Sequence, residues 1–470
     1  MTSKSSSRAV RAGSSAGAAA GAVVRSLSRR AFLKNTAAGA VATGGLLLLP
    51  SGFLRGADAP SNRINVACVG VNNQGWSDSH GVANAGGHIA ALVDVDANSL
   101  ATSAKSFAKN NPRTFRDYRE MLDKCGKDID AVTVSTPDHT HFAVAYAAAA
   151  LGKHIYVQKP LCHTADQVHR LAAVCRARGV VAQMGNQGAS SAHTRLAREY
   201  YEAGLLGDVT EVDAWTVAAT AWPQGVDDFQ PPAPAPKHLD WDLWLGPASA
   251  MDYRRGLHPF TWRGYFKFGC GALGDMAIHL MFDPYIVLGL TSPTKIEVNS
   301  TGAGKVSYPK SSTVIFHFPA ANGRGPVRLT WNDGGRRPAP LDFPNAPKLG
   351  GNGSLLRGSK FALTACGWNG HFEAYGPNAK GVKKPAEKYP RIKGGHYRNW
   401  IDAIRAGSPA TLSSPITGIC EPFAEVVMLG CIAQRLGRTL NWDAAAGAFT
   451  GDAEANALLK APAPRAGFLA

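Results

Sequence analysis

Short apolar runs separated by helix-length stretches dominate the first part of the chain. Residues 64–69 (INVACV) and 88–93 (HIAALV) are typical of buried parallel strands, and residues 129–134 and 154–157 repeat the pattern. An alanine-rich stretch through Leu151 has helical composition. Strands that alternate with helices predict a parallel α/β sheet.

The pattern changes after this region. Longer strand-like segments follow, and late apolar helices near residues 396–406 and 415–436 are expected to pack back onto the core. The predicted fold class is α/β, with an N-terminal Rossmann dinucleotide-binding domain and a C-terminal α+β domain that contains a large, mostly antiparallel sheet. The strand-like segments are residues 209–217, 295–300, 312–318 and 327–331.

At 470 residues, the chain is longer than one ordinary compact domain. We expect a twin-arginine signal peptide and leader over residues 1–59 and an NAD(P)-binding Rossmann domain over 60–185. A second, C-terminal domain is expected over 186–445, followed by a tail over 446–470; the family resemblance described below implies that this domain binds the substrate and forms the oligomer contact.

The N-terminal segment has the layout of a twin-arginine export signal. Residues 28–34 (SRRAFLK) precede an uncharged stretch from Thr36 to Pro50. A bilayer-spanning helix needs roughly 20 apolar residues, so the alternative of a permanent membrane helix is weaker, and we expect no stable membrane anchor. The sequence predicts a periplasmic or otherwise exported protein, delivered folded by the twin-arginine machinery with its cofactor tightly bound.

The charge distribution and the cysteine spacing exclude some classes of partner and site. Of the formal net charge of +16, +7 lies in residues 1–59, and no basic run interleaved with aromatic residues follows, so no nucleic-acid partner is expected. The eight cysteines include no C-x-x-C pair, which signals neither a zinc site nor a disulfide framework, and most are expected to be buried thiols.

A phosphate-binding loop is expected directly after the first strand. The fingerprint G-x-G-x-x-G uses glycines for a tight turn, for close approach to pyrophosphate and for helix packing. Here an asparagine takes the middle position, which preserves the turn because asparagine tolerates positive φ, but crowds the phosphate. The predicted cofactor-binding loop consists of Gly70, Val71, Asn72, Asn73, Gln74 and Gly75.

Asp94 ends the second apolar run, 24 residues after Gly70, where a carboxylate binds the adenosine ribose in dinucleotide domains. This favours NAD over NADP, although a nearby Arg or Lys can still serve a 2′-phosphate. The alternative is that Asp94 caps the next helix, a role open to Asp96 as well.

Lys159 follows a short strand, at the sheet edge where open α/β sheets bind ligands. A lysine beside a nicotinamide and a substrate hydroxyl can donate a hydrogen bond or a proton while hydride moves. The alternative is an ordinary surface lysine ahead of Pro160.

Taken together, these segments resemble the Gfo/Idh/MocA family of oxidoreductases, which includes glucose-fructose oxidoreductase and inositol dehydrogenase, in an exported branch with a twin-arginine signal. The family usually has Glu at the position of Gln158. The resemblance also rests on residues 135–141 (STPDHTH), 158–160 (QKP), 184–188 (MGNQG), 240–247 (DWDLWLGP) and 271–279 (GALGDMAIH). It adds Thr136, Pro137, His141, Gln158, Lys159 and Asn186 to the cofactor-binding residues.

The resemblance also implies a catalytic group of Lys159, Asp275 and His279, in which the histidine takes the hydroxyl proton as hydride leaves for the nicotinamide. Asp275 and His279 are four residues apart on an expected helix and share one face. An Asp-x-x-x-His pair is also found in metal sites, but a third ligand is not evident, so no metal is predicted. The family implies a homo-oligomer.

A loop-rich stretch from residue 222 to 265 is a candidate wall of the substrate pocket. Trp222 can stack on a sugar ring, and His258 and Arg263 can bind hydroxyls. Trp241 and Trp244 are expected to anchor the loop to the core.

The predicted function is hydride transfer between bound NAD(P) and a hydroxyl or carbonyl group of a small-molecule carbohydrate or polyol. One alternative is a glycoside-cleaving enzyme that oxidises the sugar transiently, eliminates the aglycone and regenerates NAD. A second alternative is a dinucleotide-binding protein without catalysis.

Overall fold

The structure is a computed structural model that describes residues 63–218, 222–344, 346, 348–368 and 370–469. The predicted twin-arginine motif and the apolar stretch after it lie outside the described residues. The chain from Pro60 onward forms one compact unit, which contains two sheets.

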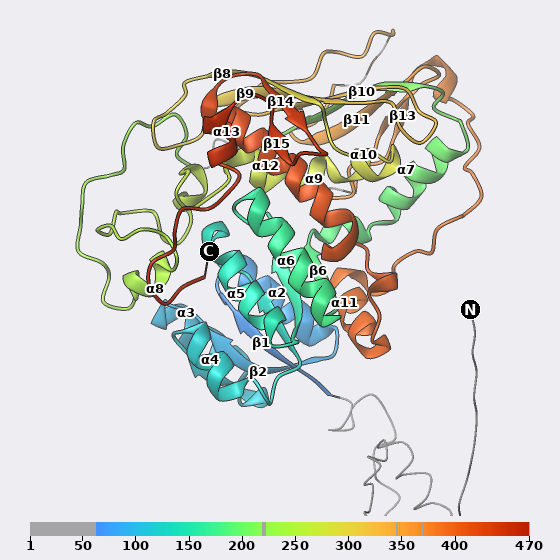
Figure 1. Cartoon of the computed structure of the whole chain (residues 1–470). Helices are drawn as coiled ribbons and strands as arrows, with labels where there is room; N and C mark the ends of the chain where they lie inside the picture. The colour runs from blue at the N-terminus through green and yellow to red at the C-terminus, as the bar shows by residue number, and fades with distance from the viewer. Residues whose placement is uncertain (1–62, 219–221, 345, 347, 369, 470) are drawn as a thin grey trace, which may run out of the picture. The chain divides into compact units, whose positions relative to one another are not determined.

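The first sheet has six strands in the order β3-β2-β1-β4-β5-β6, all paired in parallel (Figure 1). This is the predicted Rossmann topology. Its strands are β1 (Ile64–Val69), β2 (Gly87–Val93), β3 (Arg113–Phe115), β4 (Ala131–Val134), β5 (His154–Gln158) and β6 (Ala182–Gly185). Its helices are α2 (Gln74–Asn84), α3 (Ala97–Ser106), α4 (Tyr118–Cys125), α5 (Asp138–Ala150) and α6 (Ala165–Arg178).

Both faces of this sheet are buried, because alternate residues of each strand enter different core clusters. Val69 of β1 packs in a cluster with Leu171 of α6. Cys68, on the opposite face, packs in a cluster with Leu100 of α3 and with Trp400 of the late helix α11 (Gly395–Ala406). Helix α11, which begins more than 200 residues after β6 in the sequence, therefore completes one face of the first sheet.

The second sheet has nine strands in the order β13-β12-β11-β7-β10-β9-β8-β14-β15. Every pairing is antiparallel except that of β7 with β10, so the prediction of a large, mostly antiparallel sheet is confirmed. Its strands are β7 (Val209–Trp215), β8 (Lys295–Thr301), β9 (Ser311–Phe318), β10 (Val327–Asn332), β11 (Gly353–Gly358), β12 (Ala362–Thr364), β13 (Ala374–Tyr375), β14 (Leu440–Asp443) and β15 (Ala448–Phe449). The remaining α-helices are α7 (Ala192–Glu202), α8 (Trp241–Leu245), α9 (Ile278–Leu280), α10 (Phe282–Val287), α12 (Glu421–Leu436) and α13 (Ala453–Ala457).

Helix α12 lies at the centre of the largest core cluster. Its Phe423 packs edge-on against Phe282 of α10 with ring centroids 5.3 Å apart, and both side chains are fully buried. Residues 416–436 are long and apolar enough to cross a membrane, yet 67% of the most apolar window is buried inside the fold, as in the core helix of a globular protein. All eight cysteines are buried free thiols.

Candidate active site

A cleft with about 1250 Å³ of space, part of it open to solvent, lies at the carboxyl ends of the parallel strands. Residues that follow β1, β2, β4 and β5 line one side of it, which is the position where open α/β sheets bind ligands. Segments of the second part of the chain line the other side and supply Trp244, Trp262, Arg263 and Asp275. The cleft is therefore built from residues that are far apart in the sequence.

The glycine loop has the geometry that a dinucleotide phosphate requires. Gly70 has φ +77°, and a Cβ there would lie 2.6 Å from the carbonyl oxygen of Ser135. A Cβ on Gly75 would overlap the Gly70 carbonyl oxygen, so this position also excludes any larger residue. Asn72 replaces the middle glycine, and its Oδ1 accepts a hydrogen bond from the Asn73 backbone N–H at 2.8 Å. The asparagine thus stabilises the turn at the start of α2, whose N-terminus favours an anion.

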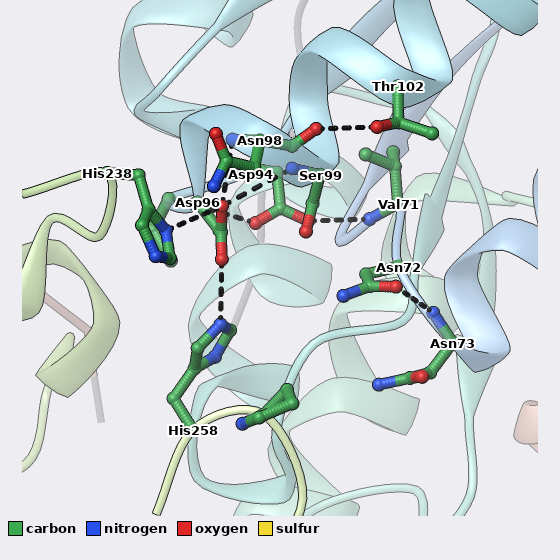
Figure 2. Close-up of polar contacts among 12 residues, drawn as sticks. Val71, Asn72, Asn73, Asp94, Asp96, Asn98, Ser99, Thr102, His238 and His258 are labelled. Carbon is green, nitrogen blue, oxygen red and sulfur yellow. Dashed lines mark hydrogen bonds and ion pairs between the residues drawn. The ribbon is translucent and has the colours of Figure 1, made fainter. Parts of the chain in front are cut away.

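Asp94 lies in the cleft beside this loop, as the ribose hypothesis predicts (Figure 2). Its two carboxylate oxygens accept the backbone N–H groups of Val71 and Asp96, each at 2.9 Å. Burial raises the pKa of Asp94, and these two hydrogen bonds oppose the rise. The carboxylate therefore fixes the glycine loop relative to β2 and leaves the cap of α3 to another residue.

Asp96 is that cap, and it also connects the two parts of the fold. Its Oδ1 accepts the backbone N–H groups of Asn98 and Ser99 at 2.8 and 3.3 Å. His258 Nε2 lies 3.0 Å from Oδ2, and His238 Nδ1 lies 3.1 Å from Oδ1. Burial raises the pKa of Asp96, but the His258 and backbone hydrogen bonds outweigh it and hold the pKa below its ordinary value. The structure thus places His258, a predicted substrate residue, in the cleft lining but against the start of α3 (Figure 2).

Lys159 and Asp275 form a buried ion pair at the opposite end of the cleft. Lys159 Nζ donates to Asp275 Oδ1 at 2.6 Å, and the two side chains are only 16% and 14% exposed. Arg263 Nε lies 3.8 Å from the same oxygen. Burial raises the pKa of Asp275, but the charges of Lys159 and Arg263 outweigh it, so the net shift is downward. Asp275 belongs to a π-helical turn, a local geometry that is frequent at functional sites, and the predicted regular α-helix begins only after it.

His279 is held in one tautomer by Asn186. Asn186 Nδ2 donates to the carbonyl oxygen of Ile278 at 3.0 Å, which turns its Oδ1 toward His279 Nδ1, also at 3.0 Å. Because Oδ1 can only accept, Nδ1 carries the hydrogen and Nε2 keeps its lone pair. Burial, reinforced by the charge of Lys159, lowers the pKa of His279 to about 3. The neutral imidazole can therefore accept a proton at Nε2.

Gln158, where the family usually has Glu, points away from the Lys159 ammonium group. Its Oε1 accepts the Lys159 backbone N–H at 3.2 Å, and its Nε2 donates to Asp78 at 3.0 Å. Asp78 is fully buried in α2 and also accepts from the hydroxyls of Ser135 and Tyr397 at 2.6 and 2.8 Å. A glutamate at residue 158 would face this carboxylate, so the amide fits the site. The carboxylate that pairs with Lys159 comes from Asp275.

The predicted site residues fall into two groups, those in the lining of the cleft and those outside it. Thr136 lines the cleft with a buried Oγ1 that has no hydrogen-bond partner in the structure, which leaves it free to bind a ligand. Residues in the lining are Gly70, Asn72, Asn73, Gln74, Asp94, Thr136, Pro137, His141, Gln158, Lys159, His258, Arg263 and Asp275. Residues outside the lining are Val71, Gly75, Asn186, Trp222 and His279.

The members of the second group lie behind the lining. The side chain of Val71 and the whole of Gly75 are buried beneath the loop, and Asn186 supports His279. Trp222 is buried against Phe260, with ring centroids 6.1 Å apart. The ring of His279 stacks on the ring of Trp368, a residue that is 43% exposed.

Several residues that line the cleft were not predicted from the sequence. Asp138 begins α5, and burial raises its pKa to about 7 even though Arg263 opposes the shift. Its place in the STPDHTH run was an available signal. The other additions carry no motif, and they include Arg116, Asp117, Tyr118 and Phe468. Among the described residues, no cluster of three or more His, Cys, Asp or Glu side chains has a metal-binding arrangement.

The fold and the cleft define a two-part dinucleotide-binding protein of the oxidoreductase class. Residues 64–186 match the model of an oxidoreductase family with an NAD-binding Rossmann fold, and residues 194–310 match its C-terminal alpha/beta domain. Together these matches cover about half of the chain. The protein belongs to the Gfo/Idh/MocA family of oxidoreductases.

Individual relatives match shorter stretches. Levoglucosan dehydrogenase of Pseudarthrobacter phenanthrenivorans is 25% identical over 191 residues, 40% of this chain and 40% of that protein. A glycosyl hydrolase family 109 protein of a Shewanella species is 28% identical over 115 residues, 23% of this chain and 25% of that protein. The chain therefore spans less than half the length of either curated relative in these matches. The crystal structure of GenD2 from gentamicin A biosynthesis, in complex with NAD, shares the fold with a TM-score of 0.55 at 21% identity, over 85% of this chain and 100% of that chain.

The Gln158–Asp78 contact generates a stability prediction. Gln158→Glu replaces the amide donor with a second buried carboxylate beside that of Asp78, and one of the two carboxyl groups must then bind a proton. A Glu whose pKa is raised in the folded state destabilises that state increasingly above its unfolded pKa. We expect Gln158→Glu to lower the free energy of unfolding by about 3 kcal/mol at pH 8 and by less at pH 5, measured by chemical denaturation.

The exposed substitution Gln230→Glu makes the same chemical change on the surface and should have little effect at either pH. Adding Asp78→Asn to Gln158→Glu exchanges the donor and the acceptor and should restore part of the lost stability. Equal stability of Gln158→Glu and wild type at pH 8 would show that the two side chains do not interact.

Proposed function

We propose that the protein is an NAD-dependent dehydrogenase that oxidises a CH–OH group of a carbohydrate or polyol. The observation that carries this proposal is the Lys159–Asp275 ion pair of 2.6 Å at the end of β5, inside the dinucleotide cleft. A buried cation that is held by a carboxylate beside the expected nicotinamide position suits binding of an oxygen atom that gains negative charge.

The residues of the cleft fit a dinucleotide. Gly70 gives the phosphates access to backbone N–H groups at the start of α2, and the unpartnered Thr136 hydroxyl can bind one further polar group. Asp94 disfavours a 2′-phosphate, and the one arginine beside it in the lining, Arg116, already donates to the carbonyl oxygens of Val95 and His238 at 2.6 and 3.4 Å. These contacts favour NAD over NADP.

The side chains divide the chemistry of oxidation between them. Lys159, positioned by Asp275, donates a hydrogen bond to the substrate oxygen. His279 accepts the hydroxyl proton at Nε2, and Asn186 orients its ring. Bound NAD supplies the acceptor for the hydride that leaves the same carbon. The C–H and O–H bonds break, a C=O bond forms, and NAD is reduced.

The substrate class follows from the aromatic groups at this end of the cleft. Arg263 lies over the rings of Phe260 and Trp262 at 4.6 and 4.3 Å and reaches Asp275 from there. Phe260, beside Arg263, and Trp368, beside His279, are exposed residues that lie outside the cleft lining, and their rings suit the apolar faces of a pyranose or a cyclic polyol.

A second candidate function is glycoside cleavage through transient oxidation. The match to a glycosyl hydrolase family 109 protein favours it, and the same lysine, aspartate and histidine would serve its redox steps. Release of an aglycone from an aryl glycoside with no net accumulation of reduced NAD would identify this reaction.

The main test combines cofactor content with turnover. The purified wild-type protein should contain or bind NAD, identified by mass spectrometry, and one member of a sugar and polyol panel should generate the absorbance of reduced nicotinamide. His279→Ala should lower kcat at least about 100-fold and leave the NAD content unchanged, because the histidine takes a proton whereas the glycine loop and Asp94 hold the cofactor.

His317→Ala, on β9 of the second sheet, is the matched control and should retain wild-type kcat. Full activity of His279→Ala would remove the histidine from the mechanism. A wild-type protein that neither contains nor binds a dinucleotide would overturn the proposed function itself.

The pKa of His279 generates a prediction about pH. Because burial lowers this pKa to about 3, the imidazole stays neutral as the pH falls through 6.5, and the proton acceptor remains available. We expect kcat/KM to show no inflection near pH 6.5 between pH 5 and 8. An inflection near 6.5 that disappears in His279→Ala would contradict the neutral, buried state.

We also propose that the protein is exported through the twin-arginine route, on the basis of the motif at residues 28–34. Arg29→Lys with Arg30→Lys preserves the charge and removes only the two guanidinium groups. Cell fractionation should find the wild type outside the cytoplasm and this double variant inside it. Equal export of both would refute the route.

A further inference from the structure

The C-terminal segment contributes Phe468 to the lining of the dinucleotide cleft, although its composition gave no sign of this. Figure 1 shows the end of the chain, in dark red, running past α8. Phe468 belongs to the lining of the cleft, together with Gly246 and Pro247 from the end of α8 and Asp117 and Tyr118 from the start of α4. The last residues thus complete a wall of a cleft that is otherwise built from elements far upstream.

The segment is fixed on its α8 side through Arg465. Arg465 Nε donates to the carbonyl oxygen of Gly246 at 2.9 Å, and its Nη2 donates to the carbonyl oxygen of Asp242 at 2.6 Å. The guanidinium group also forms an ion pair with the Asp242 carboxylate, and the Arg465 backbone N–H donates to the carbonyl oxygen of Pro247 at 3.2 Å. Because these Arg465 contacts are numerous and directional, they hold the segment in one position.

On the opposite side, the segment is fixed by Arg119. Arg119 Nη1 donates to the carbonyl oxygen of Gly467 at 2.8 Å, and its guanidinium group lies 4.1 Å from the centre of the Phe468 ring. Asp117 holds that guanidinium group in place with two further hydrogen bonds of 3.0 and 2.6 Å. The aromatic ring therefore has a fixed orientation before any ligand binds.

The position of Phe468 points to one half of the cofactor. The residues beside it follow β3, the strand beyond β2, and β2 carries the ribose acid Asp94 at its end. Lys159 lies at the end of β5, on the other side of β1. In this topology the adenosine lies toward β2 and β3 and the nicotinamide toward β5, so Phe468 belongs to the adenosine end.

We propose that the segment Arg465–Phe468 is a strap that retains the dinucleotide, and that the Phe468 ring stacks on its adenine base. The proposal rests on the NAD-dependent function proposed above and extends it to a residue at the end of the chain. A flat base between an aromatic ring and the sheet edge gains stacking energy, and it leaves only when the strap opens. An exported enzyme that meets little free dinucleotide would benefit from such slow release.

The test measures how fast the purified protein, with residues 465–469 present, exchanges bound NAD for isotopically labelled NAD, followed by mass spectrometry. Phe468→Ala should release NAD about tenfold faster than wild type, since loss of one base-stacking contact changes binding by about this factor. Phe468→Tyr keeps the ring and should stay within about twofold of wild type. A chain that ends at Pro464 should release NAD at least as fast as Phe468→Ala.

Leu469→Ala is the matched control, because Leu469 is the neighbouring side chain, is 40% exposed and lies outside the cleft lining. It should leave the exchange rate unchanged. Wild-type exchange rates in both Phe468→Ala and the shortened chain would overturn the strap. If the wild type bound no NAD, the proposed function would fail instead, so the two failures are distinguishable.

The placement at the adenine is tested separately with ADP-ribose, which lacks the nicotinamide. Phe468→Ala should weaken the binding of ADP-ribose by the same factor as that of NAD, measured by calorimetry. Unchanged affinity for ADP-ribose with weakened affinity for NAD would place the ring at the nicotinamide end and contradict the assignment.

Discussion

The buried ion pair between Lys159 and Asp275 is the interaction on which the rest of the site depends. It joins the edge of the first sheet to a helical turn of the second part of the chain, and water reaches little of either side chain. A charge that is removed from water at this depth destabilises the fold unless its partner is present, so the pair fixes how the two parts close on each other. That closure determines where Arg263 and His279 lie. The proposed chemistry therefore depends on the same contact that holds the cleft together.

Further contacts between sequence-distant segments stabilise the fold around the cleft. Asp96 connects the start of α3 to His238 and His258, and Arg465 connects the end of the chain to α8. Trp400 of α11 is fully buried against the first sheet. Each connection joins segments that are distant in sequence, so the residues that line the cleft depend on contacts made across the fold.

Local sequence patterns were sufficient to predict β1, β2, β4 and β5 of the first sheet, but not β3 or β6. They also indicated Asp94 and Lys159, which the structure places in the cleft lining. Each of these depends on a short apolar run and on the residue that ends it, and parallel strands bring such residues to one edge. The parts that were missed depend on contacts across long sequence distances. Tyr397 binds Asp78 from 319 residues away, and Phe468 reaches the residues after β3 from the other end of the chain.

His258 shows the same limit, because its aromatic neighbours suggested a substrate role, whereas its hydrogen bond to Asp96 was invisible in the sequence. The π-helical turn at Asp275 could not be distinguished from an α-helix by spacing alone.

The central claim is that this cleft passes hydride directly from a substrate carbon to bound NAD. The measurement that tests it most directly is isotope transfer, in which sugars and polyols carrying deuterium on carbon are incubated with the protein and the nicotinamide is then analysed by mass spectrometry. The account predicts deuterium in the reduced nicotinamide for one substrate of the panel, and loss of that transfer in Lys159→Met. Protein that contains NAD but acquires no label from any member of the panel, or acquires it only from deuterated water, would contradict the account.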